Sequence, residues 1–283
     1  IQKIDKETEK PLANAEFAIY DAVGKEVAKG KTNAEGKATF ANLSYGKYTY
    51  KETAAPEGYV RNETTFSFEI KEDGKVIKQT VTNKKIKGTL EIQKIDKETE
   101  KPLANAEFTI MNEAGKEVAS GKTNAEGKAT FVNLSYGKYT YKESAAPEGY
   151  VRNQTTISFE IKEDGKIIKQ TVTNDEIKGT LEIQKVDKET EKPLVDAEFT
   201  IFNAGGKEVA KGKTNEEGKA TFENLPYGKY TYKETTAPEG YVRNETTFTF
   251  EIREDGKIIK QTVTNKEIKG TLEIQKINKE TEK

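Results

Sequence analysis

The strongest constraint on the fold is a repeat with a period of 91 residues. The stretch IQKIDKETEKPLANAEF begins at Ile1 and returns at Ile92, a close variant begins at Ile183, and a shortened copy begins at Ile274. The spacing is constant, since 92 − 1, 183 − 92 and 274 − 183 all equal 91. Repeats built from a single hairpin or helix pair have periods of about 20 to 50 residues, so this longer period indicates whole small domains in tandem.

Three complete repeats and the start of a fourth account for the chain. We predict repeat 1 at residues 1–86, repeat 2 at 87–177, repeat 3 at 178–268, and the truncated first strand of a fourth repeat at 269–283. The linkers KKIKGT, DEIKGT and KEIKGT follow Asn83, Asn174 and Asn265. They are short and neither Gly/Ser-rich nor Pro-rich, which favours semi-rigid connections between repeats.

Within each repeat, apolar residues alternate with polar ones, which is typical of β-strands. In the first repeat the alternating segments are AEFAIY, KATF, YGKYTYKE, TFSFEI and VIKQTVTN, with IQKID and a short KEVAK beside them. Turn sequences separate these segments, among them NAEG at 33–36, APEG at 55–58 and EDGK at 72–75. About seven strands per repeat predict an all-β fold, a tandem array of three antiparallel β-sandwich domains.

Composition excludes several classes of function. Lys and Arg total 47 against 48 Asp and Glu, so no basic excess attracts nucleic acid. No apolar stretch approaches the roughly 20 residues that span a bilayer, and we expect no membrane insertion of this segment. The chain has no Cys and no His, which excludes a thiol nucleophile, a histidine general base and a disulfide. We therefore expect neither a cofactor nor a metal site.

Three polar residues of repeat 1 follow apolar faces of their strands. Lys3 shares a face with Ile1, Asn83 shares a face with Val81, and Glu52 follows two tyrosines on one face of YTYKE. Each position has an ordinary explanation: the lysine could extend past a sheet edge, the asparagine could cap a turn, and the glutamate could lie beyond its strand. All three together are harder to explain in this way, because solvent-facing positions lie one residue away.

A chemical interpretation accounts for all three residues at once. Burial lowers the pKa of a lysine and makes its amine nucleophilic. A glutamate placed between that amine and the asparagine amide can polarise the carbonyl group and transfer protons. The amine then attacks the carboxamide carbon, ammonia leaves, and an isopeptide bond remains. This reaction needs no His, Cys or metal, which agrees with the composition of the chain.

The motifs of each repeat resemble those of a known family. The order is IQKID at the first strand, then TNAEGKATFANLSYGKYTYKETAAPEGY, then TVTN, and near-identical versions occur in all three repeats. This pattern resembles the CnaB (Cna B-type) domains of Gram-positive surface adhesins and pilins, and it covers essentially the whole chain. The resemblance implies a prealbumin-like or inverse immunoglobulin-like sandwich with an autocatalytic Lys–Asn isopeptide bond assisted by Glu.

The resemblance also implies which residues react. The cross-linked pairs would be Lys3–Asn83, Lys94–Asn174 and Lys185–Asn265, and the catalytic residues Glu52, Glu143 and Glu234. The fourth copy has Lys276 but no corresponding Glu or Asn, and it has Asn278 where the other copies have Asp. We therefore expect Lys276 to remain a free amine.

The implied function is structural. The repeats would form the stalk or spacer of a bacterial surface adhesin, extracellular and monomeric, within a cell-wall-anchored parent protein. They would catalyse only their own cross-links, contact neighbouring repeats, and leave binding of a host extracellular-matrix protein to other parts of the parent. The alternative is that the repeats themselves bind a matrix protein such as collagen. Such a binder needs an exposed apolar patch, whereas the outward positions Lys47, Thr49 and Lys51 are polar and favour a spacer.

Overall fold

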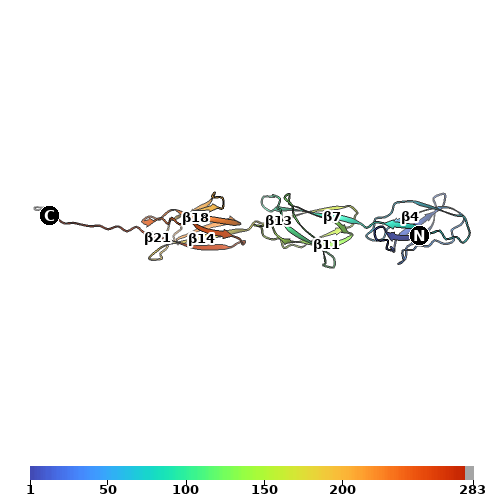
Figure 1. Ribbon diagram of the computed structural model, residues 1–283, viewed down its shortest axis with the longest axis horizontal. Coiled ribbons are helices and arrows are strands. Elements are labelled where there is room, and N and C mark those ends of the chain that lie inside the picture. The colour runs from blue at the N-terminus through green and yellow to red at the C-terminus, as the bar shows by residue number, and fades with distance from the viewer. Residues whose placement is uncertain (278–283) are drawn as a thin grey trace. The chain divides into compact units, whose positions relative to one another are not determined.

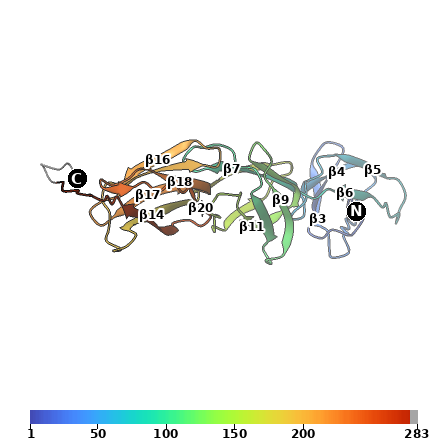
Figure 2. The same ribbon diagram turned by 60° about the vertical axis from the view of Figure 1, so that its left-hand side comes forward.

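The computed structural model describes residues 1–277. These residues form β-strands and no helix, which confirms the all-β prediction; none of them therefore forms a helix that could cross a membrane. The chain divides into two compact units, residues 1–147 with 152–173, and residues 148–151 with those from 174 onwards. The strands of each repeat form two packed layers (Figure 1, Figure 2), as expected for three β-sandwiches.

Repeat 3 shows the sandwich in its most complete form. Its strands are β14 (Lys178–Asp187), β15 (Glu198–Asn203), β16 (Glu208–Lys213), β17 (Lys219–Pro226), β18 (Gly228–Thr236), β19 (Tyr241–Val242), β20 (Phe248–Ile252) and β21 (Ile258–Glu267). One sheet has the order β17-β14-β21-β19 and the other β16-β15-β18-β20. The first and last long strands, β14 and β21, lie side by side and run parallel.

The core of repeat 3 lies between these two sheets. Buried and half-buried residues alternate along the whole of β14, as expected for a strand with one face toward the core. Leu181 and Ile183 of β14 pack in one cluster with Phe199 of β15 and Tyr232 of β18. The ring of Tyr232 stacks on that of Phe248, with centroids 5.0 Å apart. Alternation in the sequence therefore decides which side chains enter the core.

Repeat 2 repeats this arrangement. Its strands are β7 (Lys87–Asp96), β8 (Glu107–Asn112), β9 (Glu117–Lys122), β10 (Lys128–Ser135), β11 (Gly137–Ala145), β12 (Ile157–Ile161) and β13 (Ile167–Asn174). The sheet orders are β10-β7-β13 and β12-β11-β8-β9. Ile86, in the preceding linker, is partly buried against the core of this repeat, so the linker contributes to the fold that follows it.

Repeat 1 has a smaller first sheet. Its strands are β1 (Gln2–Asp5), β2 (Glu16–Tyr20), β3 (Glu26–Lys31), β4 (Gly46–Ala54), β5 (Phe66–Ile70) and β6 (Thr80–Asn83). The order β3-β2-β4-β5 matches the other repeats, but the first sheet contains only β1 and β6. The prediction of a strand at KATF is wrong for this repeat, where an isolated bridge between Gln2 and Lys37 is the only ladder contact of that segment.

The physical reason is the length of the first strand. In repeat 2, β10 pairs with residues from Lys87 to Gln93 of β7. In repeat 1, β1 begins at Gln2, the counterpart of Gln93. The KATF segment therefore lacks most of the partner residues that its copies have, and its backbone does not form a ladder.

Residues 269–277 form no strand among the described residues. Leu272 and Ile274 are 83% and 79% exposed, so the described residues do not cover the apolar face of this segment. Asn278, the departure from Asp noted in the sequence, lies outside the described residues.

Candidate functional site: buried Lys, Glu and Asn clusters

The three polar residues noted in the sequence come from two facing sheets. In repeat 1, Lys3 lies on β1 and Asn83 ends β6, and the parallel register places Lys3 opposite Val81. Glu52 lies on β4 of the other sheet, opposite Phe17 of β2. The inward faces of the two sheets meet in the core, so strand alternation directs all three side chains to one place.

In repeat 1 these side chains form one buried cluster. Lys3, Glu52 and Asn83 are 0%, 3% and 2% exposed. The Lys3 Nζ lies 3.1 Å from Glu52 Oε1 and donates a hydrogen bond to Asn83 Oδ1. The Asn83 Nδ2 donates to the same Glu52 Oε1 at 2.9 Å. One carboxylate oxygen thus contacts both the amine and the amide nitrogen.

Repeat 3 has the same geometry. The Lys185 Nζ lies 3.2 Å from Glu234 Oε1 and donates to Asn265 Oδ1. The Asn265 Nδ2 donates to Glu234 Oε1 at 2.8 Å. All three residues are buried.

In repeat 2 the lysine and the glutamate also lie close together. The Lys94 Nζ lies 3.5 Å from Glu143 Oε1. Asn174 is buried and ends β13, the neighbour of β7 in the sheet.

Burial makes the three lysines unusual. Loss of water around Lys3 lowers the pKa of its ammonium group, and the opposing attraction of Glu52 offsets this only in part. The pKa values of Lys94 and Lys185 are lowered for the same reason. The Lys3 Nζ also lies 5.5 Å from the ring centroid of Phe17. Such a lysine gives up its proton more readily than an exposed one and can act as a nucleophile.

The glutamates are held by a residue that the sequence analysis missed. The backbone N–H of Asn62 donates to Glu52 Oε2 at 2.7 Å. The N–H groups of Asn153 and Asn244 do the same for Glu143 and Glu234, each at 2.7 Å. The available signal was spacing, since Arg-Asn-x-Thr places its asparagine ten residues after the glutamate in every repeat.

A second missed group lies at the end of the lysine strand. Asp5 is 1% exposed and accepts hydrogen bonds from the N–H groups of Glu7 and Thr8 and from the Tyr59 hydroxyl, each at 2.8 Å. Burial alone would raise the pKa of Asp5, but these hydrogen bonds outweigh it and hold the pKa below its ordinary value. Burial and, to a smaller extent, the contact with Asp5 raise the pKa of Tyr59 to about 12. This group joins the first strand to the APEGY turn.

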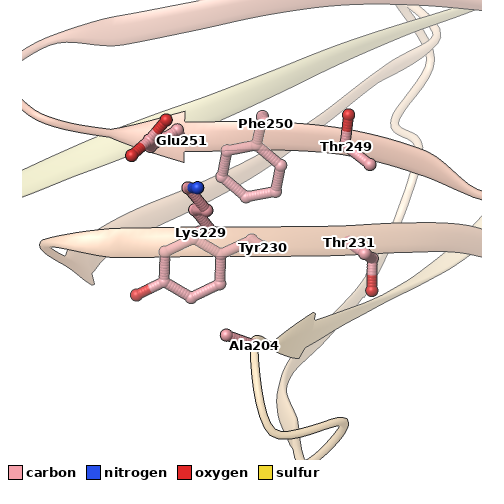
Figure 3. A pocket seen from close by; sticks show the side chains of 7 residues that line it. All are labelled: Ala204, Lys229, Tyr230, Thr231, Thr249, Phe250 and Glu251. Atoms are coloured by element: carbon pink, nitrogen blue, oxygen red, sulfur yellow. The ribbon is translucent and has the colours of Figure 1, made fainter.

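A hollow of about 470 Å³ lies on repeat 3, lined by Ala204, Lys229, Tyr230, Thr231, Thr249, Phe250 and Glu251. Figure 3 shows its charged pair, Lys229 and Glu251, on neighbouring strands, where they lie opposite each other in the β18–β20 register. Within residues 1–277, no group of three acidic side chains is arranged to hold a metal ion. The residues that line the hollow therefore do not combine a buried lysine, glutamate and asparagine as the buried clusters do.

The fold and the buried clusters together define a tandem array of prealbumin-like domains of the CnaB type. The chain belongs to the SpaA family, whose prealbumin-like fold domain matches residues 1–85, 88–176 and 179–267. This confirms the family expected from the sequence.

Individual relatives agree with this assignment. The serine-aspartate repeat-containing protein E of Staphylococcus aureus is 27% identical over 268 residues, which cover 78% of this chain and 23% of that protein. The bone sialoprotein-binding protein of the same species is 28% identical, with the same coverage of 78% and 23%. The chain therefore spans about a quarter of the length of these curated relatives.

Two solved structures show the same fold. The Bacillus anthracis TIE protein superposes with a TM-score of 0.88 at 49% identity, over 94% of this chain and 50% of that chain. The major pilin subunit BcpA of Bacillus cereus, in its D312A form, has a TM-score of 0.52 at 22% identity, over 93% and 97% of the two chains. The second match is evidence of a shared fold alone.

Proposed function

We propose that each repeat closes an internal isopeptide bond. The pairs are Lys3–Asn83, Lys94–Asn174 and Lys185–Asn265, with Glu52, Glu143 and Glu234 as the proton-transferring residues. The observation that carries the proposal is the buried cluster of repeat 1, in which Glu52 Oε1 lies 3.1 Å from the lysine Nζ and 2.9 Å from the asparagine Nδ2. Burying a lysine, a glutamate and an asparagine together is costly without such a use.

The reaction balances within the cluster of repeat 1. A proton moves from the Lys3 ammonium to Glu52, which leaves a neutral amine. The amine nitrogen forms a bond to Asn83 Cγ, a second proton passes through Glu52 Oε1 to Nδ2, and the Cγ–Nδ2 bond breaks. Ammonia leaves, one proton stays on the new amide nitrogen, and one stays on Glu52. The carboxyl group can then donate a hydrogen bond to the amide that it helped to form.

The bond would tie the first strand of a repeat to its last strand. In repeat 1 it closes a loop of 80 residues, for which the chain-entropy model of cross-links gives about 4.5 kcal/mol. Tension applied at the two ends of the repeat would pass through the covalent link and bypass the strands between.

We keep the boundaries 1–86, 87–177 and 178–268 for the repeats, with residues from 269 as the start of a fourth. Support comes from β7 and β14, which begin at Lys87 and Lys178.

At the level of the whole protein, we propose that the repeats form the stalk of an extracellular, cell-wall-anchored bacterial adhesin. The family match supports this. The repeats would act on no outside substrate and would be monomeric.

One observation favours the alternative of matrix binding by the repeats, namely the relative named a bone sialoprotein-binding protein. Binding of the isolated repeats to immobilised matrix proteins would decide for that alternative.

Intact-mass spectrometry tests the cross-links. The purified chain should be lighter than its sequence mass by three ammonia molecules. Glu52→Ala should leave two losses, because each cluster serves its own repeat, and Glu143→Ala and Glu234→Ala should behave likewise. A mass equal to that of the unmodified sequence would refute the reaction.

A further inference from the structure

We infer that Asn62, Asn153 and Asn244 are positioning residues for the cross-linking reaction. Each is anchored to the strand that carries the reacting asparagine and orients the glutamate of its repeat. This inference rests on the proposed isopeptide reaction. It assigns a role to a segment that bears none of the reacting groups.

The two oxygens of the glutamate have separate tasks. In repeat 1, Glu52 Oε1 contacts the lysine and asparagine nitrogens, and Oε2 accepts the backbone N–H of Asn62 at 2.7 Å. A carboxylate can rotate about its last torsion, which is broad. A donor on Oε2 limits that rotation and keeps Oε1 aimed at both reacting nitrogens.

The side chain of Asn62 fixes where its own N–H points. Its Nδ2 donates to the carbonyl of Thr82 at 3.1 Å, and its Oδ1 accepts the N–H of Thr64 at 2.9 Å. Thr82 directly precedes Asn83 on β6. The side chain therefore connects the segment that holds Glu52 to the strand that presents the reacting carboxamide.

This clamp is needed because the segment around Asn62 lies outside the sheets. Residues 61–65 form no strand, so no ladder fixes their backbone. The neighbouring Val60 N–H donates to the Lys84 carbonyl at 2.9 Å, which ties the start of the segment but not the N–H that reaches Glu52. The asparagine side chain supplies the missing restraint.

The same contacts occur in the other two repeats. The Asn153 Nδ2 donates to the Thr173 carbonyl at 3.1 Å, and the Asn244 Nδ2 donates to the Thr264 carbonyl at 3.1 Å. The residue after the asparagine is Glu63 in repeat 1 and Glu245 in repeat 3, but Gln154 in repeat 2. That difference provides a matched control from the chain itself.

The test follows bond formation from its start. The unreacted chain is recovered from inclusion bodies in urea and diluted into buffer to start folding. Samples are quenched at increasing times and digested. Mass spectrometry of the peptides then assigns each bond to its repeat. Repeats 2 and 3 serve as internal clocks for repeat 1. Amide hydrogen exchange of repeat 1 peptides reports whether that repeat has folded before its bond closes.

Asn62→Ala keeps the backbone N–H but removes the clamp. The bond of repeat 1 should then form at least about tenfold more slowly, since a displacement of about 1 Å can lower a reaction rate 100-fold. The bonds of repeats 2 and 3 should form at unchanged rates. Glu63→Gln should leave all three rates unchanged. Equal rates in all repeats of the Asn62→Ala chain would overturn the inference.

Asn62→Asp separates positioning from a general loss of fold. The introduced carboxylate still accepts the Thr64 N–H, but it can donate to Thr82 only when protonated, below its ordinary pKa of about 4. The rate of repeat 1 relative to repeat 3 should therefore fall at neutral pH and recover in acid. A ratio that stays low at every pH would refute the clamp. A wild-type chain that loses no ammonia would instead refute the proposed function itself.

Discussion

Residues 178–185 and 269–276 have the same sequence, KGTLEIQK, and different structures. In the first stretch, Leu181 and Ile183 are fully buried on β14, and Lys185 reaches its glutamate. In the second, Leu272 and Ile274 are 83% and 79% exposed and no strand forms. The local sequence is therefore compatible with a strand but does not make one. Partner strands on both sides, β17 and β21, make the difference.

Repeat 1 also shows that a segment with the sequence of a strand forms none when its partner residues are missing. Its KATF segment has the sequence of β10 and β17 but forms no strand. Its last strand, β6, is also shorter than β13 and β21, and the buried hydroxyl of Tyr50 has no hydrogen-bond partner. The copies Tyr141 and Tyr232 donate to Gln170 and Gln261 on the longer last strands.

The largest expected difference between the two KGTLEIQK stretches is chemical. Lys185→Ala should abolish the bond of repeat 3 and leave two ammonia losses, because the nucleophile is gone. Lys276→Ala should leave all three losses, because Lys276 is exposed and has no cluster around it. Intact mass distinguishes the two variants. Loss of a bond in the Lys276→Ala chain would show that the two stretches are equivalent after all.

Amine reactivity sharpens the same contrast in the unmutated protein. Lys276 should react fully with an amine-directed reagent, whereas Lys3, Lys94 and Lys185 should be protected by burial and by the proposed bonds. Digestion and peptide mapping measure the labelling at each lysine. An unlabelled Lys276 joined to an asparagine of another chain would mean that the array can polymerise covalently.

Core packing should give the next largest difference. Leu181→Ala removes a fully buried side chain and should destabilise repeat 3 by about 2–5 kcal/mol. Leu272→Ala removes an exposed one and should change stability by less than about 0.5 kcal/mol. Denaturant unfolding followed by tyrosine fluorescence measures both. A comparable cost for Leu272→Ala would show that residues 269–276 pack against something in solution.

The smallest expected effect concerns Asp5, the aspartate that ends the lysine strand. The folded-state pKa of Asp5 lies below its ordinary value, so its hydrogen bonds stabilise repeat 1 above the unfolded-state pKa of about 3.9, and this contribution is lost as pH falls below that value. Asp5→Asn should lower stability at pH 7 and show a weaker acid dependence. Thermal unfolding at pH 7 and pH 2.5 measures the difference. Identical pH dependence in both chains would exclude Asp5 as a source of it.

Much of this molecule follows from its sequence. The 91-residue period predicts the tandem array, and strand alternation places Lys3, Glu52 and Asn83 on inward faces, where the structure has them. These predictions succeed because both patterns can be found in the sequence itself: the period is a repetition of the same residues, and alternation is decided by which residues stand one or two positions apart.

Tertiary structure alone decided the rest. The pairing of KATF and the burial of one KGTLEIQK stretch but not the other depend on which strand lies alongside, and strand pairing joins residues far apart in sequence. The roles of Asn62 and Asp5 do not follow from strand alternation either. The ten-residue spacing from Glu52 to Asn62 is present in the sequence, but that a backbone N–H meets the carboxylate, or that an aspartate meets a tyrosine 54 residues away, is decided by how the segments pack.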